Sequence, residues 1–134
     1  MDSEAATTTY SIPEPFARTL QSLRDVLTGR DLRIVGELDL SKRIQRNLRI
    51  SLAPCVMLYV WPSDRLLRTT AARPSIALLL PLHVVISSRG ARTEIHLLRR
   101  PHCADGALMA PVVKLQVEVA QAIEAIAIGL NLVR

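Results

Sequence analysis

Apolar and polar residues change their spacing several times along this chain, and each change marks a new element. Residues 7–12 are rich in β-branched side chains, which predicts a short strand that Pro13 stops. Pro15 then opens a helix at a position where its missing N–H costs nothing, and Gly29 is expected to end it. The inward stripe of this helix is predicted to be Phe16, Leu20, Leu23 and Leu27.

Alternation predicts a half-buried strand from Leu32 to Leu38, with Leu32, Ile34 and Leu38 inward. A second helix follows, with Asp39 or Ser41 as its N-cap. Its inward residues are expected to be Leu40, Ile44 and Leu48, and its outer side carries Lys42, Arg46 and Arg49.

The run CVMLYVW, Cys55 to Trp61, is apolar at every position, which is typical of a central strand. Cys55 is therefore expected to be a small buried residue. Pro62 ends the strand, and a short helix is expected from Asp64 to Ala72.

The run PSIALLLPLHVVI contains Pro81, and a proline within a strand belongs at an edge or a bulge. The prediction is a strand in two segments, Ile76–Leu80 and Leu82–Ser87, with a bend between them. Its hairpin partner is expected over Ala91–Arg99, after a turn at Ser88-Arg89-Gly90.

The last and longest helix is expected to begin near Ala110, or to be kinked at Pro111. Its buried stripe is predicted to be Leu108, Val112, Leu115, Val119, Ile123, Ile126 and Leu130. Further apolar residues, Val113, Val117 and Ile128, give it a second apolar side, for which a second subunit is one partner.

The element order is strand, helix, strand, helix, strand, short helix, strand, strand, helix, which indicates a single α+β domain over residues 7–134. Residues 1–6 are expected to be a disordered N-terminus. A chain of 134 residues suits one domain, and its mean hydropathy of +0.24 indicates apolar surface that a homodimer would bury.

The net charge of +5 comes from fifteen arginines and two lysines against twelve acidic residues. Arg43, Arg46 and Arg49 form a candidate nucleic-acid stripe, although an ordinary solvated helix face has the same pattern. No signal peptide is visible, and the C-terminal apolar segment, although long enough to span a bilayer, carries Lys114, Glu118 and Glu124 at helical spacing, so we expect a cytoplasmic protein.

Parity places His83 on the polar side of its strand, together with Glu94 and His96 of the next strand. If Arg89-Gly90 is the two-residue loop, His83 stands directly opposite His96. Two imidazoles and a carboxylate are plausible zinc ligands, and His102 or Cys103 would supply a fourth. Hydrogen-bonded surface histidines and a pH-sensitive interface are the alternatives.

The sequence contains no phosphate-binding loop, dinucleotide fingerprint or nucleophile elbow, which favours a non-catalytic protein. The leading hypothesis is a module that binds a small molecule or a protein through its sheet, with ligand-binding residues Tyr59, Trp61, Pro81 and His83. A nucleic-acid-associated protein and a metal-dependent sensor or enzyme are the alternatives.

The run PSIALLLPLHVVI, with LAPCVMLYVWPSDRLLR before it and ALMAPVVKLQVEVAQAI after it, resembles the family-302 domains of unknown function, which are small bacterial and archaeal proteins. Their hallmark segment is close to PEIGLLLPCNVVV. The resemblance implies a curved, mostly antiparallel sheet of about five strands with helices on one face, similar to the TATA-binding-protein fold and commonly dimeric.

This sequence departs from the family pattern at both characteristic cysteines. Leu82-His83 stands where the family has Cys-Asn, and YVWPS, residues 59–63, replaces a Gly-Ala-Cys-Asn-Pro stretch. Any chemistry that depends on those cysteines is therefore not expected here.

Overall fold

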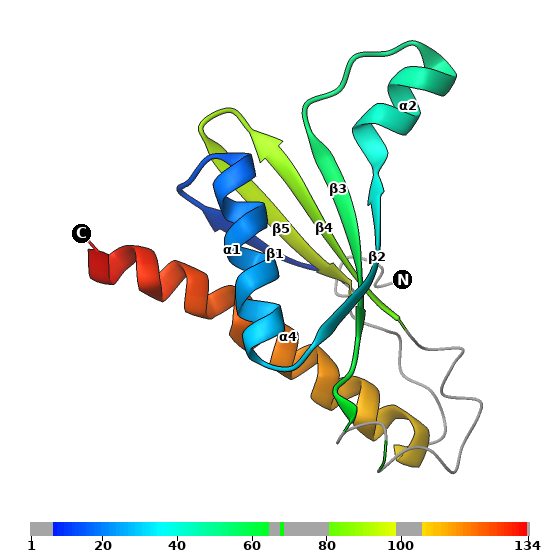
Figure 1. Ribbon diagram of the computed structural model, residues 1–134, viewed down its shortest axis with the longest axis vertical. Helices are drawn as coiled ribbons and strands as arrows, with labels where there is room; N and C mark the ends of the chain where they lie inside the picture. Colours follow the sequence, from blue (N-terminus) through cyan, green and yellow to red (C-terminus); the bar gives the residue numbers. More distant parts are fainter. Residues whose placement is uncertain (1–6, 65–67, 69–80, 99–105, 134) are drawn as a thin grey trace.

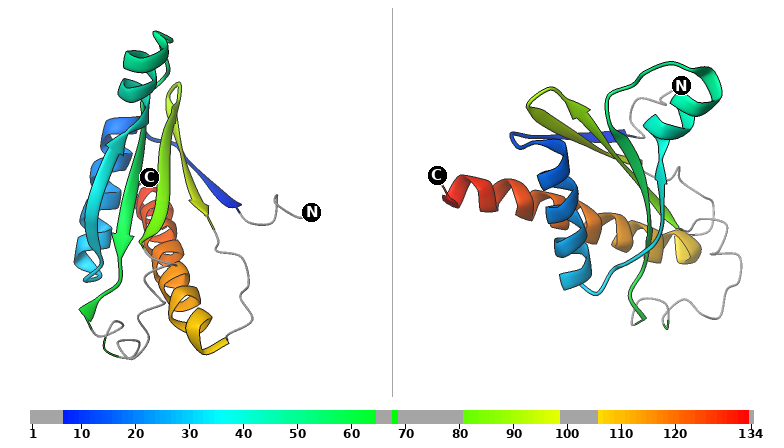
Figure 2. Two further views of the ribbon diagram at one scale, coloured as in Figure 1. Left: turned by 90° about the vertical axis from the view of Figure 1, so that its right-hand side faces the viewer. Right: turned by 45° about the horizontal axis from the view of Figure 1, so that its top comes forward.

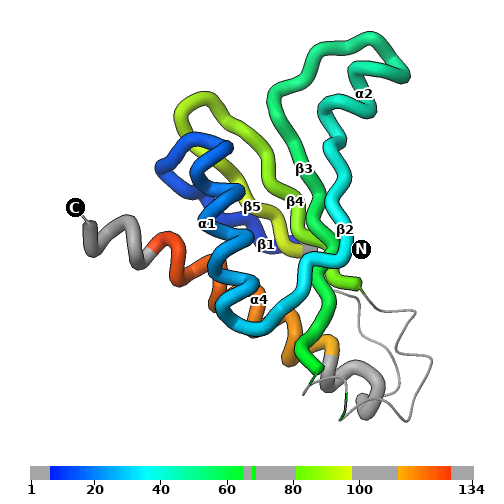
Figure 3. Tube along the Cα trace, in the orientation of Figure 1, coloured from blue at the N-terminus to red at the C-terminus, as the bar shows by residue number. Residues whose placement is uncertain are grey.

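The structure, a computed structural model, describes residues 7–64, 68, 81–98 and 106–133 (Figure 1). Within that part, the side chains of residues 98, 106–111 and 128–133 are outside the description (compare Figure 3). The predicted disordered N-terminus, the segment Ile76–Leu80, and both His102 and Cys103 lie outside the described residues, as does most of the predicted short helix to Ala72.

Five antiparallel strands form one sheet in the order β1-β5-β4-β3-β2. They are β1 Thr7–Ile12, β2 Arg33–Asp39, β3 Cys55–Trp61, β4 Leu82–Arg89 and β5 Arg92–Leu98. The described helices are α1 Phe16–Gly29, α2 Leu40–Leu48 and α4 Gly106–Val133. The predicted α+β architecture is therefore confirmed.

The core lies on one face of this sheet, under α1 and α4, which contact each other and the strands. Alternate residues of the central strands point into it and are almost completely buried: Val56, Leu58, Val60, Leu82, Val84, Ile86, Ile95 and Leu97. The predicted stripes of the helices meet them, through Leu20, Leu23 and Leu27 of α1 and Val112, Leu115, Val119 and Ile123 of α4.

The ends of α1 and α4 differ from the prediction. After α1, the left-handed backbone occurs at Asp31 with φ of 63°, and Gly29 is the last helical residue. The helix α4 begins at Gly106, so the predicted start near Ala110 is wrong. Pro111 is tolerated inside it at the cost of one backbone hydrogen bond.

A β-bulge in β2 corrects the predicted alternation of that strand. The register against β3 shifts between Ile34 and Gly36. Because of this extra residue, the side chains after it point to the opposite face of the sheet from the one that regular alternation gives. Glu37 therefore points to α1 and binds Arg24 through two contacts of 2.7 Å. Leu38, which was expected inward, pairs with Met57 on the opposite face.

The helix α2 stands beyond the end of the sheet, away from α1 and α4 (Figures 1 and 2). Of the two predicted N-caps, Asp39 and Ser41, it is Asp39 that caps the helix, accepting from the Lys42 N–H at 2.9 Å. The predicted inward stripe is wrong, because no residue of α2 is buried and Leu48 is 64% exposed. Leu40 and Ile44 are half-buried, and α2 contacts β3 without reaching the core.

The β4–β5 hairpin turns at Gly90-Ala91, one residue later than predicted, and Arg89 pairs with Arg92. Gly90 has a φ of +65°, and the first loop position of a type II′ hairpin requires such a value. The turn shifts the pairing by two residues, so His96 lies opposite Val85. The predicted His83–His96 pair is therefore wrong, although both residues keep their predicted face.

No helix in the described part of the chain is long and apolar enough to cross a membrane.

Candidate functional site

The face of the sheet opposite the core is not crossed by any of the three described helices, and we call it the open face. Its central side chains are only half-buried, whereas their neighbours in the chain are almost completely buried. The β2–β3 side of the open face is apolar and contains Leu38, Cys55, Met57, Tyr59 and Trp61. Its β1–β5 side is polar and contains Thr7, Thr9, Ser11, Arg92, Glu94 and His96.

Four ring-bearing residues lie towards the same end of β3 and β4, at Tyr59, Trp61, Pro81 and His83, and we call them the ring cluster. Tyr59 pairs with His83, and their rings contact edge to face, with centroids 5.0 Å apart and an angle of 89°. Trp61 is two residues after Tyr59, and Pro81 directly precedes Leu82, the partner of Val60. Of the four residues that the sequence indicated for ligand binding, the structure shows contact between Tyr59 and His83, and the pairing register places Trp61 and Pro81 near them.

Gly36 determines where the Tyr59 ring lies. The two residues are cross-strand partners, and a Cβ atom on Gly36 would stand 3.0 Å from Tyr59 Cδ2. Very few real Cβ atoms approach another atom so closely, so the absence of a side chain here lets the ring lie against the β2 backbone. Sequence reasoning did not identify Gly36, because the bulge that aligns it with Tyr59 carries no clear sequence signal.

Trp61 and Tyr59 differ in their relation to the core. Trp61 is partly buried and packs against the edge of the core cluster, so it contributes to folding as well as to the open face. Tyr59 is half-buried outside that cluster. The ring cluster thus has one member fixed by the core and one that contacts the strand surface.

Cys55 lies at the other end of β3, where it pairs with Ser87. The expectation of a small buried cysteine is wrong, because Cys55 is half-buried and belongs to the open face. Partial burial raises the pKa of its thiol, and the nearby Asp39 carboxylate raises it further. A raised thiol pKa leaves little thiolate at neutral pH, which makes Cys55 a poor nucleophile.

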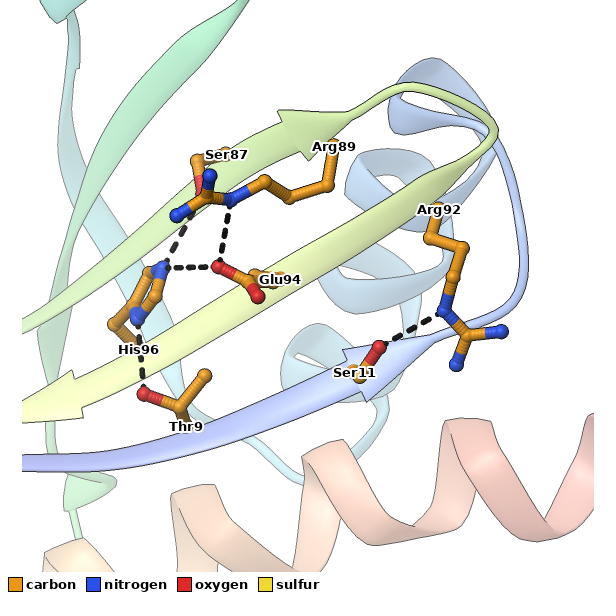
Figure 4. A network of polar contacts seen from close by, with 7 residues as sticks. All are labelled: Thr9, Ser11, Ser87, Arg89, Arg92, Glu94 and His96. Atoms are coloured by element: carbon orange, nitrogen blue, oxygen red, sulfur yellow. Dashed lines mark hydrogen bonds and ion pairs between the residues drawn. The ribbon is translucent and has the colours of Figure 1, made fainter.

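His96 is the centre of a polar network that joins β1, β4 and β5 (Figure 4). Its Nδ1 atom lies 3.1 Å from Thr9 Oγ1, and its Nε2 atom lies 3.2 Å from Ser87 Oγ. Glu94 Oε1 is 3.6 Å from the same Nε2 atom and accepts from Arg89 Nε at 3.0 Å. Sequence reasoning missed Thr9 and Ser87, which only the pairing register identifies.

The geometry of this network does not match a hydrolase triad. A triad needs its carboxylate at the imidazole nitrogen opposite the nucleophile. Here Glu94 approaches Nε2, the nitrogen that also contacts Ser87, while a hydroxyl occupies the Nδ1 side. The network instead ties the edge strand β1 to the middle of the sheet through side chains.

The zinc hypothesis rested on a direct cross-strand pair of His83 and His96, and the observed register does not form that pair. His83 contacts Tyr59, and His96 contacts Thr9 and Ser87. In the described part of the chain, no group of three or more His, Cys, Asp or Glu side chains is placed to hold a metal ion. Because His102 and Cys103 lie outside that part, a zinc site that includes them stays a prediction.

The third candidate set, Arg43, Arg46 and Arg49, is exposed on and just after α2, as expected for its outer side. Arg49 ends the helix in the left-handed conformation, with φ of 56°. A shallow depression is lined by Lys42, Gln45, Arg46 and Arg49. Because these residues belong to one helix and its cap, the depression is a gap between solvated side chains and does not enclose a ligand.

Comparison with known proteins agrees with this architecture. The model of the domain of unknown function DUF302 matches residues 8–128. The crystal structure of an uncharacterized conserved protein DUF302 from Bacillus stearothermophilus superposes with a TM-score of 0.77 at 16% identity, covering 89% of this chain and 96% of that one. That likeness establishes a shared fold.

A second structure, TTHA0849 from Thermus thermophilus, has 11% identity and covers 93% of this chain and 97% of its own. Its TM-score of 0.28 is too low to support an argument. The comparison with curated proteins gives no match. On the match over residues 8–128 and the shared fold, the chain belongs to the DUF302 family.

Proposed function

We propose that this protein is a non-catalytic binding module whose ring cluster holds a small, flat, apolar ligand on the open face. The observation that carries the proposal is the position of Tyr59, which lies against the Gly36 backbone and edge-on to His83 without belonging to the core. Aromatic residues on a sheet face that no described helix crosses provide a rigid surface on which a planar ligand gains both stacking and apolar burial.

The division of the open face supports a ligand of limited size. Apolar side chains occupy the β2–β3 side, and the β1–β5 side is occupied by hydroxyl, imidazole and charged groups that already bind one another. A ligand on the ring cluster therefore meets few polar groups, namely the Tyr59 hydroxyl and the His83 imidazole of the cluster itself and the β1–β5 groups at its margin. Such a site resembles the general pattern of an apolar surface with a few polar groups that fix orientation.

The test uses the fluorescent, uncharged probe N-phenyl-1-naphthylamine together with the emission of Trp61, the only tryptophan in the chain. We expect the probe to brighten on binding and Trp61 emission to fall. Tyr59→Leu keeps apolar volume but removes the ring, and we expect about tenfold weaker binding, consistent with the usual contribution of one aromatic contact.

Ser11→Ala is the matched control, because Ser11 lies on the polar side of the same face and its only described side-chain partner is Arg92. It should leave probe binding unchanged. Equal binding by the wild-type and Tyr59→Leu proteins would overturn the proposal, since the ring cluster would then contribute nothing specific.

We also propose that the protein forms a homodimer through α4. Val113 and Val117, four residues apart on this helix, are 44% and 48% exposed, which makes an apolar ridge outside the core. The ridge supports the earlier expectation of a subunit contact by this helix. Light scattering during gel filtration should show a dimer for the wild type and a monomer for Val113→Ser/Val117→Ser. A wild-type monomer at all accessible concentrations contradicts this proposal.

A further inference from the structure

The segment from α2 to the start of β3, residues 40–54, forms an arm that stands clear of the core (Figures 1 and 2). Within and after its helix, three large aliphatic residues face water: Leu48, Ile50 and Leu52 are 64%, 52% and 44% exposed. Exposed aliphatic residues this close together are typical of a contact surface. The described polar anchors of the arm are at its base, where Asp39 caps α2 and Ser41 accepts from the Cys55 N–H.

The same arm carries four basic residues, Lys42, Arg43, Arg46 and Arg49, all exposed. The sequence has no acidic residue between Asp39 and Asp64. None of the ion pairs found in the described part of the chain involves these four cations. The arm therefore presents a concentrated positive charge beside exposed aliphatic side chains.

Charge determines which occupant fits this surface. Two identical arms in contact would bring eight cations together, which disfavours a second copy. A nucleic acid would neutralise the cations but would leave Leu48, Ile50 and Leu52 in water. An anionic lipid surface would neutralise the cations and also remove the aliphatic side chains from water, because headgroups attract the cations while the aliphatic residues enter the acyl boundary.

We propose that the arm docks the protein on anionic lipid surfaces, with α2 lying in the plane of the interface. The helix has nine residues, so it lies on the bilayer and does not span it. The surface is separate from the ring cluster, because the arm joins β3 at Cys55, whereas Tyr59 and Trp61 lie about 13 Å and about 20 Å farther along that strand. The proposal therefore holds or fails independently of ligand binding on the open face.

Sedimentation with vesicles tests the proposal. The full chain should pellet with vesicles of phosphatidylcholine mixed with phosphatidylglycerol, should not pellet with phosphatidylcholine alone, and should be released by salt. Arg43→Gln/Arg46→Gln should lower the partition coefficient roughly 25-fold, because each basic residue near such a surface contributes roughly fivefold. Leu48→Ser/Ile50→Ser should also reduce partitioning while leaving its salt dependence unchanged.

The control variant Arg18→Gln/Arg30→Gln removes the same charge from exposed positions at the two ends of α1. It should keep most of the binding, and circular dichroism should show that all variants remain folded. If the wild type does not bind the mixed vesicles, or if the control loses as much affinity as Arg43→Gln/Arg46→Gln, the proposal is wrong.

Two further outcomes would assign the arm to another occupant. Salt-dependent binding of duplex DNA that Arg43→Gln/Arg46→Gln abolishes and Leu48→Ser/Ile50→Ser leaves intact, without vesicle binding, would overturn the proposal in favour of nucleic acid. A dimer that Leu48→Ser/Ile50→Ser converts to monomer, again without vesicle binding, would overturn it in favour of a second copy.

Discussion

The two faces of this sheet are built from alternate residues of the same strands, yet they have different physical roles. On the helix-covered face, Leu58 and Ile86 are completely buried. On the open face, their chain neighbours Met57 and Val85 are cross-strand partners and remain half-buried. The comparison teaches that apolar character alone does not assign a strand residue to the core. The covered face stabilises the fold, and the open face provides surface for binding.

The largest expected effect is a difference in stability between substitutions at two adjacent residues of β3, Met57 and Leu58, which lie on opposite faces of the sheet. Leu58→Ala should lower the free energy of unfolding by about 3 kcal/mol, because it leaves a cavity between the sheet and its helices. Met57→Ala should cost less than about 1 kcal/mol, since its side chain already contacts water. Urea unfolding of both variants measures the difference. Equal losses would mean that the open face is covered in solution.

The next prediction concerns the close contact between Gly36 and Tyr59. Gly36→Ala should destabilise the protein by about 1 kcal/mol and weaken probe binding, because the new Cβ atom displaces the ring. Gly29→Ala is the matched control, since a Cβ atom there meets nothing within 4 Å. The control should be neutral or slightly stabilising. If both substitutions raise the melting temperature equally, the ring does not lie against the β2 backbone.

The stability of the arm depends on a helix cap, whereas the stability of the covered face depends on the burial of apolar side chains. The backbone N–H of Lys42 and the hydroxyl of Ser41 both donate to Asp39, and these bonds lower the pKa of its carboxyl group. Asp39→Ala should therefore reduce the local stability of α2 by about 1 kcal/mol and leave the core unchanged. Hydrogen exchange of α2 amides, compared with those of β4, measures this effect.

The same lowered pKa predicts a pH dependence of α2. A group whose pKa is lower in the folded state stabilises that state above its unfolded pKa, about 4, and loses the contribution as the pH falls towards the folded value. The NMR secondary shifts of α2 should therefore decrease below about pH 4, and Asp39→Asn should remove that step. A step of equal size in the variant would assign the transition to another carboxyl group.

The smallest expected effect concerns the alkylation rate of the Cys55 thiol. A cysteine in the core would not react at all. In a Cys103→Ser protein, iodoacetamide should modify Cys55 severalfold more slowly than in urea, because its raised pKa limits the thiolate at neutral pH. Raising the pH should restore the rate, and Asp39→Asn should accelerate it slightly. Mass spectrometry follows the reaction. Modification as fast as in urea would show that Cys55 is not sheltered by its neighbours.

The sequence predicted the elements well, because their signals are local. Alternation and helical spacing identified all five strands and the buried stripes of α1 and α4. The errors arose where one residue changes a register. The bulge at Gly36 moved Leu38 to the open face, and the turn at Gly90 moved His96 away from His83. The hairpin shift of two residues keeps every side chain on its face, so alternation fits both registers equally well. The bulge instead reverses the faces of Glu37 and Leu38, and regular alternation gives no sign of such an inserted residue.

The candidate site was predictable only in part for the same reason. Tyr59, Trp61, Pro81 and His83 were identified because they occur near the ends of two adjacent apolar runs. Gly36 and Thr9 belong to the open face only through pairing with distant strands. The exposure of α2 was also missed, because amphipathic spacing shows which side of a helix is apolar but not whether anything covers it.

Native mass spectrometry of the full chain, purified without an affinity tag or a chelator, will show whether the ring cluster holds a ligand. We expect the additional mass of a small apolar molecule on the wild-type protein, with that mass lost from Tyr59→Leu and retained by Ser11→Ala. An additional mass that is equally present on all three proteins would contradict the claim that the ring cluster of the open face is the binding site.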